Sequence, residues 1–311
     1  MPDLRPVIEE EQIHALLQQH FTEPITHLVP IEGGQVARTF AFRAGEQEYI
    51  LRFTPADHLP IGFGKEARLS RTIASPQIPI PRIIQEGLWQ GLYFAISHRV
   101  PGQMVEKLPV QEVIQLIPAM LATLFAIHQV DVSQQKNYGV FNEQGVAHCP
   151  DWRSFLVQVK DEEEDWDYFG KWHHLFDDTF LERDLFDDLF QRMMRLLDCC
   201  SADRYLVHGN YSMRNIIAHE GKITGVVDWL DARYGDFVYD IAGLDFWIPE
   251  LRMSERCLDY YQERLGLISF YEERVLCYEC YTAMSALRFF AKKGDESAYR
   301  WTRRRIVGLL A

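Results

Sequence analysis

The chain has 311 residues and a formal net charge of −13 at pH 7; 47% of its residues are hydrophobic and 25% are charged. These values are ordinary for a globular protein and exclude a disordered or fibrous chain, and the length favours two lobes or domains. An acidic surface repels phosphate backbones, so we expect no nucleic-acid partner and favour a neutral or cationic ligand.

The acidic side chains are unevenly spread along the chain. Twelve of the 45 Asp and Glu residues lie between Asp161 and Asp188, where only Lys171 and Arg183 oppose them. Taken alone, such a run predicts a solvated helix face or loop.

The N-terminus and the cysteines bear on the compartment. The first residues lack the apolar run of a secretory signal and the six cysteines follow no disulfide framework, so we expect reduced thiols and a cytoplasmic location. Cys277 and Cys280 have CxxC spacing but fall in a helical pattern, which favours core thiols over a zinc site. The most apolar stretch, Val113 to Val130, contains Pro118 and polar residues; it predicts a buried helix, so we expect no membrane partner.

The first hundred residues predict a β-rich lobe with few helices. Apolar residues at helical spacing indicate a helix over 9–21, and a second short helix is expected around Lys65–Ile73. Alternating and β-branched runs predict five strands: Ile25–Ile31, Val36–Phe42, Tyr49–Phe53, Ile83–Trp89 and Leu92–Ser97.

The character of the chain changes after a Pro-Gly connector at residues 98–102. From about residue 110 the pattern is mainly helical, with one β-rich interruption at 204–227. Pro and Gly mark a boundary between such segments. We therefore predict an α+β protein with a lobe at 1–97, a hinge at 98–102 and a helical lobe at 103–311.

The most informative segment is residues 205–247. Two apolar runs each end in polar residues: the first at His208-Gly209-Asn210, with Asn215 five positions after Asn210, and the second at Asp228. In protein kinases a catalytic-loop Asp, an Asn and a metal-binding Asp follow one another at similar spacing. Mg²⁺ prefers oxygen ligands of this kind, so Asn215 and Asp228 are candidate metal ligands and position 210 is the candidate for orienting an acceptor hydroxyl.

This segment resembles the aminoglycoside phosphotransferases, small-molecule kinases with a protein-kinase-like fold. The matching residues are His208-Gly209-Asn210-Tyr211, Asn215, Ile223–Trp229, Tyr234-Gly235-Asp236 and Asp240-Ile241-Ala242. Within that family the hygromycin-B kinases look closest, through Tyr138–Phe141, Gln144-Gly145, Asp151–Phe155 and Asp245-Phe246-Trp247.

The resemblance implies a bilobal fold, with the nucleotide on the β-rich lobe and the acceptor in the helical lobe. The implied nucleotide-binding residues are Gly33, Gly34, Arg52, Glu66 and Ser97. Gly33 and Gly34 would form a turn over the phosphates, although GGxxxR is not a full glycine-rich motif. Arg52 stands where protein kinases keep a Lys, and Glu66 is its expected partner.

Position 210 departs from the family pattern, which has Asp there. An amide hydrogen-bonds a hydroxyl but accepts no proton at neutral pH, and loss of general-base help commonly costs ~10²–10⁴ in rate. A pseudokinase, a slow kinase and a deliberately altered enzyme all fit this substitution. His208 is expected to brace the loop, whereas Asp236 and Asp240 are expected to cap a helix and anchor loops.

The resemblance implies transfer of a phosphate from ATP or GTP, with Mg²⁺, to a hydroxyl of a small cationic molecule. Trp229, Asp231 and Trp247 follow the metal Asp and are candidate acceptor contacts, because carboxylates beside aromatic rings suit ammonium groups. A hygromycin-like aminoglycoside is the leading acceptor. The alternatives are a kinase of another small alcohol and a non-catalytic nucleotide-binding protein. We expect a monomer or a weak dimer.

Overall fold

The computed structural model describes residues 5–33, 37–56, 62–162 and 170–310. These residues form an α+β protein, which confirms the predicted fold class. They divide into two compact units: one comprises Met1–Leu116, Asn142–Gln144 and Arg214–Leu230, and the other comprises Ile117–Phe141, Gly145–Met213 and Asp231–Ala311. The hinge predicted at 98–102 stays a prediction.

A five-stranded antiparallel sheet is the framework of the first unit, in the order β1-β2-β3-β5-β4. Its strands are β1 (Ile25–Ile31), β2 (Arg38–Ala44), β3 (Gln47–Pro55), β4 (Ile83–Trp89) and β5 (Leu92–His98). Each lies at or within a few residues of a predicted strand. The turn of the β2–β3 hairpin contains Gly45 at φ 60°, a conformation that glycine adopts readily.

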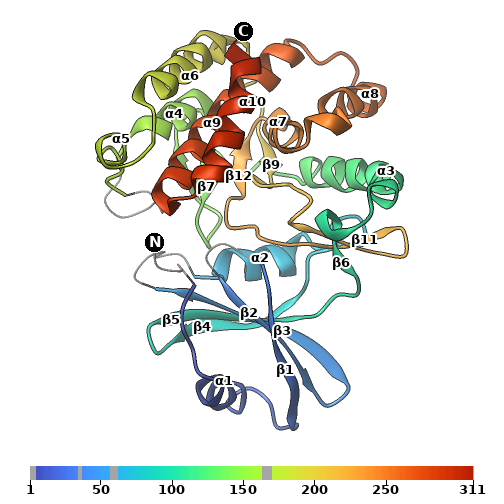
Figure 1. Ribbon diagram of the computed structural model, residues 1–311. Helices are drawn as coiled ribbons and strands as arrows, with labels where there is room; N and C mark the ends of the chain where they lie inside the picture. Colours follow the sequence, from blue (N-terminus) through green and yellow to red (C-terminus); the bar gives the residue numbers. More distant parts are fainter. Residues whose placement is uncertain (1–4, 34–36, 57–61, 163–169, 311) are drawn as a thin grey trace. The chain divides into compact units, whose positions relative to one another are not determined.

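Alternation along these strands separates two cores. Leu51 and Phe53 of β3 face the helix α1 (Glu10–Leu17), in a cluster of buried side chains that includes Leu16. On the opposite face α2 (Gly64–Thr72) packs through Ala67; Figure 1 shows the two helices on opposite sides of the sheet. Because side chains alternate across a strand, Arg52 is directed to the α2 side.

The predicted helix 9–21 ends early, at Leu17. Its last apolar residue, Phe21, still packs against the same core cluster, but it follows the turn at 18–20 and lies outside the helix. The apolar spacing of residues 9–21 therefore identified side chains that share one core, but it predicted a helix that is too long.

A second sheet in the first unit joins segments far apart in sequence. It pairs β6 (Gln103–Met104) with β10 (Ile216–His219), which forms a hairpin with β11 (Lys222–Val226). A 3₁₀ turn, η1 (Val105–Lys107), follows β6. This pairing explains why residues 214–230 belong to the first unit although the chain has by then already contributed to the second.

Helices dominate the second unit. The chain enters it along α3 (Val110–His128). The other helices are α4 (Trp152–Val157), η2 (Gln158–Lys160), α5 (Leu175–Asp178), α6 (Arg183–Leu196), η3 (Leu197–Cys199), α7 (Val238–Trp247), η4 (Pro249–Leu251), α8 (Met253–Leu265), α9 (Tyr271–Lys293) and α10 (Glu296–Leu310). The long helix α9 packs against α6, α7 and α10 (Figure 1).

A small sheet, ordered β8-β7-β12-β9, accompanies the helices of the second unit. Its strands are β7 (Tyr138–Phe141), β8 (Ala147–Cys149), β9 (Tyr205–Val207) and β12 (Arg233–Gly235). Strand β9 leads directly to His208, so this sheet sets the starting point of the predicted catalytic loop.

Two apolar features have their predicted places in the core. Cys277 and Cys280 are buried on α9, as expected for core thiols. Among the described residues, α3 is the one helix long and apolar enough to cross a membrane by length and composition. Its side chains Met120, Leu124 and Ile127 are fully buried, a spacing typical of a core helix.

Gly235, at the end of β12, provides a test of the packing around Trp152 in the second unit. A Cβ there would lie 2.3 Å from the ring of Trp152, which is buried and donates its indole N–H to the Tyr278 hydroxyl at 2.9 Å. We expect Gly235→Ala to lower the free energy of unfolding by about 2 kcal/mol, because overpacking a fixed ring is costly. Urea denaturation measures the change.

Gly243→Ala in α7 is the matched control, since a Cβ there meets no atom within 4 Å. It should be neutral or stabilise by up to ~1 kcal/mol through helix propensity. Equal effects of the two substitutions would contradict the packing account.

Candidate active site

A buried ion pair joins the sheet of the first unit to α2. The guanidinium of Arg52 donates to both carboxylate oxygens of Glu66, through Nη1 at 3.4 Å and through a shorter contact from Nη2. The side chains are 19% and 8% exposed, and the guanidinium also lies 4.7 Å from the centre of the Phe63 ring. The predicted pair is present, and its two-pronged geometry fixes the guanidinium orientation.

Strand register explains how Arg52 reaches the helix. Arg52 lies opposite Ala95 of β5 and Thr39 of β2. These small neighbours leave space beside the guanidinium on the α2 side of the sheet.

The two predicted metal ligands lie at the ends of one hairpin. Asn215 is 8% exposed and precedes β10, and Asp228 follows β11. The Val227 amide donates to the Asn215 carbonyl at 2.9 Å, so the backbones beside the two side chains are bonded to each other. Asn215 and Asp228 therefore belong to one hydrogen-bonded local element of the first unit.

The backbone of Asp228 is in the left-handed region, at φ 64°. A non-glycine residue adopts this conformation rarely, and such residues are enriched at functional sites. The Asp228 charge also acts on Arg52. Burial tends to lower the pKa of Arg52, but the carboxylates of Glu66 and Asp228 outweigh it and raise that pKa. Arg52 thus stays charged under the influence of both carboxylates.

The remaining nucleotide candidates differ in what the structure describes. Gly33 has φ 124°, a conformation that favours glycine, and lines a concave surface of about 460 Å³ with Arg5 and Arg38. Gly34 lies outside the described residues. Ser97 is buried in β5, paired with Ile50 of β3, and its role in nucleotide binding stays a prediction.

The predicted catalytic loop belongs to the second unit and is held by Asp240. One carboxylate oxygen of Asp240 accepts the His208 amide and the other accepts the Gly209 amide, both at 2.8 Å. His208 in turn accepts the Asn210 amide on its Nδ1 at 3.3 Å. These bonds give His208 and Asp240 the bracing roles expected of them, and Asn210 is exposed at the end of the braced loop.

Gly209 allows this loop to form. It has φ 84°, and a Cβ there would lie 2.2 Å from the carbonyl oxygen of Asp231. Only glycine accepts both the left-handed conformation and the close backbone approach. Steric constraints therefore require glycine at the position between His208 and Asn210.

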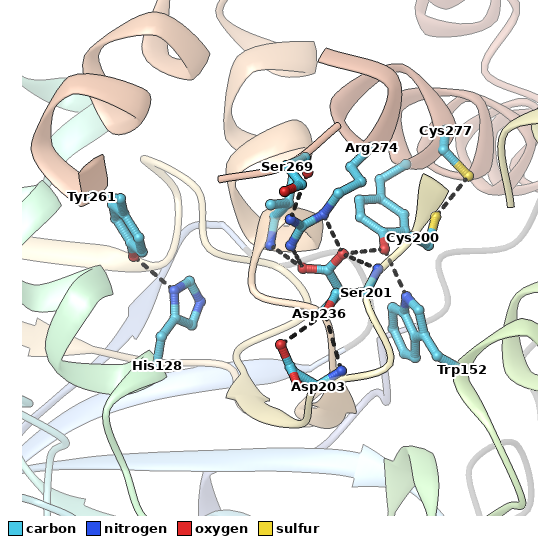
Figure 2. A network of polar contacts seen from close by, with 12 residues as sticks. His128, Trp152, Cys200, Ser201, Asp203, Asp236, Tyr261, Ser269, Arg274 and Cys277 are labelled. Carbon is cyan, nitrogen blue, oxygen red and sulfur yellow. Dashed lines mark hydrogen bonds and ion pairs between the residues drawn. The ribbon is translucent and has the colours of Figure 1, made fainter. Parts of the chain in front are cut away.

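Asp240 is itself held by a buried chain of side chains. Its carboxylate contacts His128 Nε2 at 3.1 Å. His128 Nδ1 in turn contacts the Tyr261 hydroxyl at 2.7 Å, as Figure 2 shows. Burial tends to raise the pKa of Asp240, but the bonds and charges of His128 and His208 lower it overall. Asp240 is therefore ionised while it accepts the loop amides.

Asp236 has a structural role in the same unit. Figure 2 shows its carboxylate among the side chains of Arg274 and neighbouring residues. Arg274 donates to both oxygens, and the Tyr278 hydroxyl, the Ser201 amide and the Val238 amide also donate to them. The last of these bonds caps the start of α7, as the sequence suggested.

The three candidate acceptor residues have different surroundings. Trp229 is fully buried, and its indole N–H donates to the Val226 carbonyl at 3.0 Å. It is a core residue, so the prediction that it contacts an acceptor is wrong. Asp231 is exposed, with one oxygen 3.7 Å from Arg233. Trp247 stacks on Trp301 with ring centres 5.7 Å apart.

Part of the acidic segment has an ordinary explanation. Residues 163–169 lie outside the described residues. In α6 the acidic side chains Asp184, Asp187 and Asp188 are exposed while Phe186 and Leu189 are buried. This is the solvated helix face that the charge run alone predicted.

Sequence reasoning missed Lys65 and Arg274. Lys65 is 1% exposed and donates to the Leu230 carbonyl at 2.7 Å, and Arg274 neutralises Asp236 from α9. Both partners are distant in sequence, so local patterns carried no signal for them. A charged residue within a buried stripe is the only available hint.

Comparisons with known proteins agree with this geometry. The model of the phosphotransferase enzyme family matches residues 27–275. The hygromycin-B 4-O-kinase of Escherichia coli is 28% identical over 261 residues, which are 84% of this chain and 73% of that protein. Acyl-CoA dehydrogenase family member 11 of Rattus norvegicus is 24% identical over 82% of this chain, which spans only 33% of that protein.

A solved structure supports the same relationship. A thermostable mutant of the aminoglycoside phosphotransferase APH(4)-Ia, in a ternary complex with ADP and hygromycin B, is 25% identical with a TM-score of 0.81. The alignment covers 96% of this chain and 98% of that one. The resemblance predicted from residues 208–242 is confirmed: the chain belongs to the phosphotransferase enzyme family and is an aminoglycoside phosphotransferase-like kinase.

Proposed function

We propose that the protein transfers the γ-phosphate of ATP or GTP to a hydroxyl of a hygromycin-B-like aminoglycoside, with a chemical step weakened by Asn210. The observation that carries the proposal is the intact set of nucleotide and metal candidates in one unit: Arg52, Glu66, Asn215 and Asp228. A cytoplasmic location and a monomeric or weakly dimeric state belong to the same proposal.

The donor set fits Mg²⁺. The ion is usually bound through one or two carboxylates together with the phosphates of the substrate, and it requires oxygen ligands. Asp228 supplies a carboxylate and Asn215 an amide oxygen, from two ends of one hairpin. When bound, Mg²⁺ neutralises charge on the β- and γ-phosphates. Arg52 adds a fixed cation for the phosphates, oriented by Glu66.

Asn210 affects proton removal in the proposed reaction. Its amide oxygen can accept a hydrogen bond from the acceptor hydroxyl and so orient it, but the amide cannot take the proton away. Positioning and electrostatic stabilisation provide most of the acceleration in phosphoryl transfer. The proposal therefore allows binding of both substrates with slow turnover.

An aminoglycoside acceptor is supported by the relative whose name specifies hygromycin B and by the acidic composition of the chain. Asp231 and Trp247 offer a carboxylate and an aromatic face in the second unit, which suit an ammonium group. The identity of 28% leaves room for another small alcohol as acceptor.

A non-catalytic nucleotide-binding protein is the second candidate function, and Asn210 is the observation that favours it. A protein retained for binding alone needs no group that takes the proton of the acceptor hydroxyl, and the amide of Asn210 cannot take it. The retained Asn215 and Asp228 favour the enzyme, because transfer of the γ-phosphate requires the metal, whereas a protein kept for binding alone can lose its metal ligands.

Nucleotide binding tests the shared part of both candidates. We expect ATP or GTP to raise the melting temperature of the chain more with Mg²⁺ than with EDTA, because a ligand bound only to the native state stabilises it. Asp228→Asn should remove the difference between Mg²⁺ and EDTA, and Asp231→Asn, which alters a nearby exposed carboxylate, should keep it. If no nucleotide shifts the melting temperature of the native chain, the kinase proposal is wrong.

Restoring the base tests catalysis. We expect Asn210→Asp to increase hygromycin-B-dependent ADP release by ~10²–10⁴-fold, the usual contribution of a general base. If Asn210→Asp turned over only other alcohols, the acceptor would be another small alcohol and not an aminoglycoside. Nucleotide binding without any turnover would favour the non-catalytic alternative. Asn210→Ala is the control and should not exceed the native rate.

A further inference from the structure

We propose that Lys65 is a positioning residue for the metal-binding segment: its ammonium group fixes the backbone after Asp228 and so favours binding of the metal–nucleotide complex. The inference rests on the proposed function, since it assigns that segment to the metal.

Burial makes the contact of Lys65 specific. Lysine is almost never fully buried unless its charge has a partner, and Lys65 is 1% exposed. Its Nζ donates to the Leu230 carbonyl at 2.7 Å, a distance typical of a charge-assisted hydrogen bond. A position that needed only apolar contact would be filled at lower cost by Leu or Met.

The carbonyl that Lys65 holds lies two residues after Asp228. On the other side of Asp228, the Val226 amide donates to the Pro79 carbonyl at 2.7 Å and the Val227 amide donates to the Asn215 carbonyl at 2.9 Å. The segment is therefore held both before and after the residue with φ 64°. A left-handed conformation of this kind persists only where the surroundings impose it, and Lys65 is one of the groups that do so.

Helix α2 connects this contact to the ion pair. Lys65 and Glu66 are neighbours, and successive residues of an α-helix point about 100° apart because a turn contains 3.6 residues. Lys65 therefore reaches Leu230 while Glu66 reaches Arg52. One helix thus sets both the phosphate-binding cation and the metal-binding carboxylate, and a shift of α2 would disturb both.

Two measurements on Lys65→Met test the inference, since methionine keeps an unbranched apolar stem and removes the charge. We expect faster hydrogen exchange of the amides at 226–230 in the ligand-free chain. We also expect affinity for AMP-PNP to fall about tenfold with Mg²⁺, the effect of one charge-assisted hydrogen bond, and to stay nearly unchanged with EDTA. Lys65→Arg, which keeps the cation, should recover part of the loss.

Arg71→Met is the matched control, because Arg71 is an exposed cation on the same helix; it should change neither measurement. If Lys65 had only a general structural role, Lys65→Met would speed hydrogen exchange throughout the first unit. It would also lower the affinity for AMP-PNP equally with and without Mg²⁺. That result would overturn the inference. The two failures can be told apart because hydrogen exchange needs no ligand. If the native chain binds no nucleotide, the proposed function is wrong. If Lys65→Met leaves exchange at 226–230 unchanged, the role of Lys65 is wrong.

Discussion

The two-pronged pair of Arg52 and Glu66 is the interaction on which the candidate site depends. The Arg52 guanidinium is largely buried, and its desolvation would cost free energy without a carboxylate beside it. Glu66 supplies that carboxylate from α2. Together with the apolar packing of Ala67, the pair holds α2 on the sheet. Helix α2 in turn carries Lys65 to the segment after Asp228. Substrate phosphates would meet a cation already oriented, so little rotamer freedom is lost on binding.

A buried charged group also organises the candidate catalytic loop in the second unit. Asp240 is a buried carboxylate whose oxygens accept the amides of His208 and Gly209, and His128 supplies a further bond. In both units a buried charge fixes backbone next to the candidate chemistry, whereas the residue that would contact the acceptor hydroxyl, Asn210, is exposed. Replacement of Asp by Asn at 210 changes proton transfer without disturbing this support, because the loop is held through backbone amides.

Much of the fold could be predicted from local patterns. The strands of the first sheet followed from alternation, and the pairing of Arg52 with Glu66 followed from their order in a kinase-like chain. The β6–β10 pairing could not be predicted, since it joins Met104 to Ile217 across more than a hundred residues. Likewise the sequence pattern around Trp229 suits a pocket or a core equally well, and only its burial assigns it to the core. Lys65 was missed because its partner is a backbone carbonyl, which leaves no trace in residue type.

The central claim is that the first unit retains a working nucleotide and metal site despite Asn210. A crystal structure of the native chain grown with AMP-PNP and Mg²⁺ tests it most directly. The account predicts a metal ion coordinated by the Asn215 amide oxygen and the Asp228 carboxylate, with nucleotide phosphates at hydrogen-bond distance from Arg52. A nucleotide bound away from Arg52, or a metal ion with neither Asn215 nor Asp228 among its ligands, would contradict it.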